Sequence, residues 1–212
     1  KQDIKWLIEI TKEEDISKIC IDSSDPDVIK FALAFLDNND IIINSINGEK
    51  DKKKKLLDII KGVPECKIIV LTMDDNGIPK TIEKKIEIAK NLIDELSQIG
   101  MKKENIFIDC LVEPISVDIK SAMNFLKCVK KIKEEVPEVK TTCGLSNVSF
   151  GLPKRKIVNK YFLSLCIYEG IDSVIIDPTI IDIKEGLYTT NLLTGNDEFC
   201  MNYIRGIREG RF

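Results

Sequence analysis

Residues 142–153 read Thr142-Cys143-Gly144-Leu145-Ser146-Asn147-Val148-Ser149-Phe150-Gly151-Leu152-Pro153. An apolar strand is expected to run here directly into a polar loop that contains glycine and one amide side chain. A basic Lys154-Arg155-Lys156 segment and an apolar helical pattern over residues 157–168 follow. This order is typical of the carboxyl edge of the sheet in an α/β barrel or a doubly wound fold, where ligands usually bind. The stretch therefore predicts a ligand site.

The same strand–helix unit recurs along the chain at a spacing of roughly thirty residues, which is typical of consecutive βα units around a parallel sheet. Continuous apolar runs predict six strands buried on both faces. They cover residues 19–22, 41–44, 67–72, 106–109, 141–145 and 173–177. Amphipathic segments between them predict helices: Asp25 and Pro26 begin one over residues 28–36, and Gly100 ends another over residues 82–99.

Polar side chains stand at the carboxyl end of every predicted strand. They are Asp22, Asn44, Thr72 with Asp74, Asp109, Asn147 and Asp177. A turn or a cap of the next helix explains any one of them, and we assign only this role to Asp74 and Asp177. Taken together, the six ends predict a ring of hydrogen-bond donors and acceptors, which suits a flat heterocycle that needs several directed hydrogen bonds.

The regular spacing favours a (β/α)8 TIM barrel over an open doubly wound sheet, because no single switch point interrupts the polar strand ends. Six strands are two too few for a barrel, and the chain opens with a predicted helix over residues 4–10. We therefore expect an α/β barrel whose first two βα units are missing, forming one domain over residues 1–212 that is short at its N-terminus.

Composition narrows the possible chemistry. The net charge of −3 gives no basis for nucleic-acid binding, and no apolar run approaches the roughly 20 residues that span a bilayer, so we expect a soluble, cytoplasmic protein. Histidine is absent, which excludes Ser-His and Cys-His nucleophiles and histidine-bound metals. The seven cysteines lack a C-x-x-C pair, so no metal site is predicted. Any catalysis must use carboxylates, amides, hydroxyls or a cofactor.

Several segments together resemble the cobalamin-dependent methyltetrahydrofolate methyltransferases, especially the enzyme that serves the corrinoid/iron–sulfur protein of the acetyl-CoA pathway. They are Ile21-Asp22-Ser23, Ile43-Asn44-Ser45, Leu71-Thr72-Met73 with Gly77-Ile78-Pro79-Lys80, Ile108-Asp109, and Gly144 to Ser149 with Arg155 and Asn159. The similarity runs from end to end, and Gly-Leu-Ser-Asn-Val-Ser is its most specific part. It implies an eight-stranded barrel of the dihydropteroate synthase-like type, usually homodimeric, that binds a reduced pterin at the carboxyl ends of its strands.

The resemblance implies transfer of the N5-methyl group of methyltetrahydrofolate to the cobalt(I) of a corrinoid held by a separate protein, in one-carbon metabolism. A tertiary amine is a poor leaving group, so N5 must gain proton character as cobalt attacks the methyl carbon. Asn147 would be the catalytic residue, orienting N5 and acting through water and a nearby carboxylate. Asp22, Asn44 and Asp109 would bind the amide and amino edge of the pterin. Arg155 would contact the corrinoid partner or the folate tail, or only solvate the loop.

Other functions stay open at this point. Dihydropteroate synthase shares the barrel and the pterin site, but its Arg-x-His motif on the last strand has no counterpart in Ile175-Ile176-Asp177-Pro178. The same chemistry could instead serve an O-demethylase, glycine betaine or methionine system, and nothing in the sequence separates these partners. A catalytically silent folate-binding module is favoured by the missing strands, which in the resembled family also contact the pterin.

Overall fold

The computed structural model describes residues 2–36 and 40–212. The chain forms two compact units, of which the first comprises the chain up to Asp109 together with Glu138–Lys140. The second comprises Cys110–Pro137 and Thr141–Phe212. That both units belong to one pterin-binding domain stays a prediction. No helix in the two described ranges is long and apolar enough to cross a membrane.

The sheet has the strand order β1-β2-β3-β4-β5, so its strands follow the order of the chain. Their bounds are β1 Ile19–Asp22, β2 Ile41–Gly48, β3 Lys67–Asp74, β4 Ile106–Asp109 and β5 Lys140–Thr142. Parallel pairing joins β1 to β2, β2 to β3 and β3 to β4. A doubly wound sheet would reverse its strand order at a switch point, and this order has no reversal. The topology therefore favours the barrel over the open sheet.

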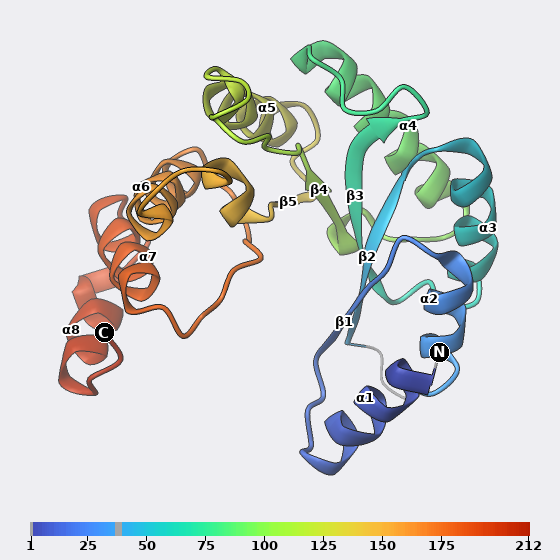
Figure 1. Cartoon of the computed structure of the whole chain (residues 1–212), viewed down its shortest axis with the longest axis horizontal. Helices are drawn as coiled ribbons and strands as arrows, with labels where there is room; N and C mark the ends of the chain where they lie inside the picture. Colours follow the sequence, from blue (N-terminus) through green and yellow to red (C-terminus); the bar gives the residue numbers. More distant parts are fainter. Residues whose placement is uncertain (1, 37–39) are drawn as a thin grey trace. The chain divides into compact units, whose positions relative to one another are not determined.

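The helices of the first unit are α1 Gln2–Glu13, α2 Pro26–Leu33, α3 Lys50–Ile60 and α4 Ile82–Gln98, with a short 3-10 helix, η1, at Lys103–Asn105. As predicted, Asp25 caps α2: its Oδ1 accepts a hydrogen bond from the Asp27 amide at 2.9 Å. Gly100, with φ +93°, follows the end of α4 in a left-handed conformation that suits glycine. Figure 1 shows α2, α3 and α4 on the same side of strands β1 to β3.

The core of the first unit lies between these helices and one face of the sheet. The apolar side chains of this face include isoleucines and a valine that are each at most 7% exposed: Ile21, Ile43, Ile68, Val70, Ile106 and Ile108. Ile29, Leu56 and Leu92 are among the buried residues of these helices, each at most 3% exposed. Burial of this kind contributes roughly 25 cal/mol per Å² of apolar area, so this face fixes the side of the sheet on which the helices pack.

The second unit is mainly helical. It contains α5 Ser121–Glu135, α6 Arg155–Tyr168, α7 Ile181–Leu193 and α8 Met201–Arg208, with 3-10 helices η2 Leu145–Ser149 and η3 Glu198–Cys200. In Figure 1 α6 and α7 run side by side. The strand predicted at residues 141–145 is shorter than expected, because residues 145–149 form the helix η2.

The sixth predicted strand, residues 173–177, is wrong as a regular strand. The segment makes one isolated parallel bridge, between Gly144 and Ile175. Three backbone bonds support it: Ser173 N donates to Thr141 O at 3.1 Å, Ile175 N to Cys143 O at 2.8 Å, and Leu145 N to Ile175 O at 3.2 Å. The apolar pattern thus placed the segment correctly beside β5, but the turn into η2 ends the pairing after one register position.

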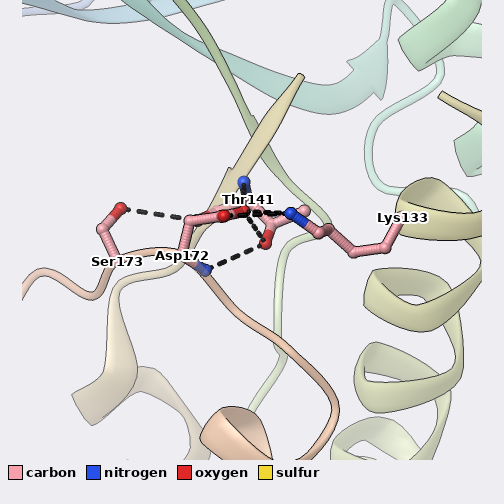
Figure 2. A network of polar contacts seen from close by, with 4 residues as sticks. All are labelled: Lys133, Thr141, Asp172 and Ser173. Carbon is pink, nitrogen blue, oxygen red and sulfur yellow. Dashed lines mark hydrogen bonds and ion pairs between the residues drawn. The ribbon is translucent and has the colours of Figure 1, made fainter. Parts of the chain in front are cut away.

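A polar network fastens the amino end of β5 to its neighbours in the second unit (Figure 2). The Asp172 carboxylate accepts hydrogen bonds from the Thr141 amide at 2.7 Å and the Thr141 hydroxyl at 2.9 Å. Lys133 of α5 donates to both carboxylate oxygens, at 2.9 and 3.0 Å. The Ser173 hydroxyl donates to Thr141 O at 3.4 Å. One carboxylate thus joins a helix, a strand and the segment after α6.

We predict that Asp172→Ala destabilises the protein, because it removes the acceptor for three donor groups at once. Hydrogen bonds to a charged group contribute roughly 1.5–3 kcal/mol, so a loss of about this size in the free energy of unfolding is expected from urea denaturation. Asp172→Asn keeps an oxygen for the Thr141 amide and should lose less. An alanine variant that unfolds at the wild-type urea midpoint would contradict the role of this network.

Candidate functional site

Three of the predicted site residues share one face of the sheet in the first unit. In a parallel pair, residues opposite each other in register point to the same face. Asp22 lies opposite Asn44, Asn44 lies opposite Ile69, and Leu71 lies opposite Asp109. Since Ile69 and Leu71 are two positions apart on β3, all of these side chains lie on one side. Asp22 and Asp109 end β1 and β4, whereas Asn44 lies within β2, which continues to Gly48 beyond the predicted end at residue 44. We call this side, with Asp22, Asn44 and Asp109, the polar face.

The polar face is opposite to the face that the helices cover. Asp109 is buried at 6% exposure, whereas Asp22 is exposed and Asn44 is half-buried. The backbone at these strand ends is fixed: the Thr72 hydroxyl donates to Asp109 O at 3.2 Å, and the Ser23 amide donates to Asn44 O at 2.9 Å. Two carboxylates and one amide therefore share the polar face, a set suited to accept hydrogen bonds from ring N–H and amino groups.

A pocket of about 270 Å³ opens at this edge of the first unit. Strand residues Ser45, Leu71 and Met73 line it together with side chains of α2 and α3. Leu71 belongs to the polar face by its register, but Ile29 and Leu56, which are buried on the side that the helices cover, also line the pocket. Asp22, Asn44 and Asp109 do not line this pocket, so it is separate from the three polar groups.

The other polar strand ends have structural roles. Thr72 is fully buried, and its hydroxyl is used in the bond to Asp109 O. Asp74 accepts a hydrogen bond from the Asn76 amide at 2.9 Å, and Asp177 accepts from the Thr179 amide at 2.9 Å and the Thr179 hydroxyl at 2.7 Å. The two Thr179 bonds hold the pKa of Asp177 below its usual value. The predicted ring of six polar ends is therefore smaller than expected.

Asn147 lies in the second unit, in η2, and its side chain is exposed. Leu145 and Val148, at most 1% exposed, anchor the turn on either side. The backbone N–H of Asn147 donates to Gly144 O at 3.2 Å, and the backbone N–H of Phe150 donates to the backbone O of Asn147 at 3.1 Å. A Cβ at Gly144 would lie 3.2 Å from Asn147 Nδ2, so glycine gives the side-chain amide its room.

Arg155, the first residue of α6, is bound to the same turn. Its Nε donates to Ser149 Oγ at 3.0 Å and its Nη2 donates to Ser146 O at 2.7 Å. Asn159, one turn further along α6, donates to Ser146 Oγ at 3.3 Å. The structure therefore brings Asn147 and Arg155 together within the second unit.

The segment after β4 is a part of this turn's support that the sequence did not identify. The Ile115 amide donates to Val148 O at 3.0 Å, and the Ser116 hydroxyl donates to Phe150 O at 2.9 Å. Pro114 gave the only local signal, since it predicts a turn but not its partner. Bonds between residues more than thirty positions apart leave no periodic pattern in a sequence.

In the part of the chain that the structure describes, no group of three or more His, Cys, Asp or Glu residues is arranged so that it could hold a metal ion. Burial raises the pKa of the Cys66 thiol to about 11, which leaves it protonated at neutral pH. Cys20 is exposed on the polar face beside Asp22, and its thiol pKa is also raised, mainly by desolvation and further by the Asp22 charge.

Comparison with known proteins identifies the family. A family model described as "Pterin binding enzyme" matches residues 1–177. The chain belongs to the pterin-binding enzyme family. This pterin-binding enzyme is 36% identical over 211 residues to the methylcorrinoid:tetrahydrofolate methyltransferase of Eubacterium limosum, an alignment that covers 99% of this chain and 78% of the relative. It is also 33% identical over 170 residues to methionine synthase of Mycobacterium leprae, covering 74% of this chain and 14% of the relative.

Solved structures establish the fold of this pterin-binding enzyme. Dihydropteroate synthase of Yersinia pestis matches with a TM-score of 0.65 and 12% identity, over 89% of this chain and 72% of the other. The Coxiella burnetii enzyme matches with a TM-score of 0.63 and 15% identity, over 87% and 71%. At such low identity the likeness shows the fold alone. It confirms the predicted barrel of the dihydropteroate synthase-like type.

Proposed function

We propose that this pterin-binding enzyme transfers the N5-methyl group of methyltetrahydrofolate to the cobalt(I) of a corrinoid carried by a partner protein. The observation that carries the proposal is the polar face, where Asp22, Asn44 and Asp109 lie on one side of the sheet. Sequence identity of 36% across nearly the whole chain to a methylcorrinoid:tetrahydrofolate methyltransferase supports it.

The proposed binding mode follows from complementary hydrogen bonding. The pyrimidine side of a reduced pterin presents an amino group and ring N–H donors, and carboxylate oxygens accept from them. Asn44 can both donate and accept, so it can serve the neighbouring carbonyl or ring nitrogen. Burial of Asp109 strengthens its hydrogen bonds, because fewer water molecules compete for the carboxylate.

The proposed role of Asn147 follows from the chemistry at N5. Cobalt(I) attacks the methyl carbon, the N5–CH3 bond breaks, and N5 keeps a proton so that the neutral amine leaves. An amide has no acidic proton, but it donates one hydrogen bond and accepts another, and so it holds N5 and its proton in one orientation. The proton itself comes through water and a carboxylate.

The same residues would catalyse the reaction in either direction, because a catalyst lowers the barrier for forward and reverse transfer alike. The name of the E. limosum relative places the methylcorrinoid first and tetrahydrofolate second. Net flux from methyltetrahydrofolate to cobalt, or from methylcorrinoid to tetrahydrofolate, then depends on which methyl donor is supplied. The corrinoid partner in this proposal belongs to an O-demethylase, glycine betaine, methionine or acetyl-CoA system.

The first experiment is a calorimetric titration of methyltetrahydrofolate into the purified chain, followed in the same sample by the absorbance of added cob(I)alamin. We expect saturable binding and formation of methylcobalamin. The reverse assay, with methylcobalamin and tetrahydrofolate, should proceed as well. Binding without turnover in either direction would reject the transferase and support a catalytically silent folate-binding module, whereas a folded chain that binds no folate would reject both.

We further propose that the enzyme is a homodimer that acts in the cytoplasm. Large apolar side chains of α6 and α7 in the second unit are exposed, among them Tyr161, Tyr168 and Leu193. They border a groove of about 670 Å³, and contiguous apolar surface of this kind is often a protein interface. Sedimentation velocity at micromolar concentration tests whether the enzyme is a dimer, and a single monomeric species would reject the dimer.

A further inference from the structure

Arg155 makes its hydrogen bonds on both sides of Asn147. Ser146, whose carbonyl oxygen accepts from Nη2 at 2.7 Å, precedes Asn147 in the turn. Ser149, whose hydroxyl accepts from Nε at 3.0 Å, follows it. Because one planar guanidinium binds two points of this five-residue turn, it fixes both the position and the orientation of the turn against α6.

Neighbouring contacts strengthen this attachment. The guanidinium lies 5.7 Å from the centre of the Phe150 ring, in a cation–π contact. The Ser149 side chain is fully buried, and its hydroxyl donates to Ser146 O at 3.2 Å, so Arg155 closes a small internal network. Asn159, 6% exposed, holds the Ser146 hydroxyl from the next turn of α6. Arg155 therefore already uses part of its N–H donors within the protein, and these donors are not offered to a ligand or a partner.

We propose that Arg155 is a positioning residue for methyl transfer: it fixes the turn so that the Asn147 amide is presented to N5 in one orientation. This inference rests on the proposed function, because it names the residue that controls the proposed catalytic amide. It differs from a role in holding the folate tail or the corrinoid partner, and each role affects a different kinetic constant.

The test compares Arg155→Lys with the wild type and with Lys156→Gln as a matched control. Lysine keeps the positive charge but cannot form the two-point fork or the planar contact with Phe150. Lys156→Gln removes a positive charge one position away and leaves the turn intact. Since a displacement of about 1 Å at a catalytic group can cost 100-fold in rate, we expect Arg155→Lys to lower kcat by at least about tenfold. Lys156→Gln should stay within about twofold.

Substrate affinity and the choice of corrinoid acceptor should separate three roles of Arg155: positioning the turn, contacting the corrinoid partner and contacting the folate tail. The dissociation constant of methyltetrahydrofolate should change less than about twofold in Arg155→Lys, and the loss in kcat should be equal with free cob(I)alamin and with a corrinoid protein. A loss confined to the corrinoid protein would overturn the proposal in favour of a partner contact. A rise in KM that appears only with polyglutamylated folate would overturn it in favour of a tail contact.

A measurement independent of activity separates failure of this inference from failure of the proposed function. The backbone N–H groups of Asn147 and Phe150 are hydrogen-bonded within the turn, so their hydrogen exchange should be faster in Arg155→Lys. The backbone N–H groups of α5 should exchange at the wild-type rate. Unchanged exchange at both amides would overturn the positioning role. If the wild type transfers no methyl group but both amides still exchange faster in Arg155→Lys, the role of Arg155 in the turn is supported and only the proposed function is rejected.

Discussion

Replacing Asn147 by alanine is expected to lower kcat for methyl transfer by about 100-fold. Removal of one preorganised hydrogen-bond donor from a site where charge changes in the transition state typically costs 100- to 1000-fold. The side chain is exposed and borders Gly144, so its loss leaves no cavity in the core. The far-UV circular dichroism spectrum and the melting temperature should therefore equal those of the wild type. The measurement is single-turnover formation of methylcobalamin from methyltetrahydrofolate.

The matched control is Asn91→Ala, which removes the same side chain from the exposed surface of α4. It should transfer methyl groups at the wild-type rate. If Asn147→Ala also retained the wild-type rate, the catalytic role of this amide would be rejected. A loss seen only in KM would assign Asn147 to substrate binding, because an interaction made equally in the ground state and the transition state leaves kcat unchanged.

Replacing Asp109 by alanine is expected to weaken binding of methyltetrahydrofolate by roughly 1–3 kcal/mol, which is about a 5- to 150-fold rise in the dissociation constant. The reason is that a buried pterin N–H group would lose its acceptor while it remains shielded from water. Asp109 is 6% exposed, so water replaces the carboxylate poorly. Isothermal titration calorimetry measures the effect.

Two further variants sharpen this experiment. Asp109→Asn keeps the shape and one acceptor oxygen but removes the charge, so its affinity should lie between those of the wild type and the alanine variant. Asp58→Ala, on the exposed surface of α3, removes a carboxylate from the first unit away from the sheet and should bind folate as the wild type does. An unchanged dissociation constant in Asp109→Ala, with the melting temperature preserved, would remove this residue from the pterin site.

Much of the fold was predictable because its signals are local. Apolar runs gave β1 and β4 with the bounds that the structure has, and Asp25 and Gly100 marked the start of α2 and the end of α4. Each of these signals depends on residues within a few positions of one another. A strand's inward face, a cap and a left-handed glycine are therefore visible in sequence alone.

The candidate site was predictable only in part. The sequence shows which polar residues follow the predicted strands, but it does not show which of them share a face and which form internal hydrogen bonds. Asp22, Asn44 and Asp109 look in the sequence like Thr72, Asp74 and Asp177, because each is a polar residue at a strand end. The register of β1 to β4 separates them: it places the first three on one face, and Thr72 forms an internal bond. Register depends on pairing across the sheet, which no single strand encodes.

The sequence by itself determined the parallel α/β architecture, the strand ends that carry polar groups and the turn that carries Asn147. Only the tertiary structure decided that residues 173–177 form a single bridge instead of a strand, that Asp172 joins Lys133 to Thr141, and that Arg155 binds the Asn147 turn. The physical reason is the range of the interactions. Apolar periodicity is set by neighbours along the chain, whereas the partner of a polar side chain is set by which backbone and hydroxyl groups folding brings within about 3 Å.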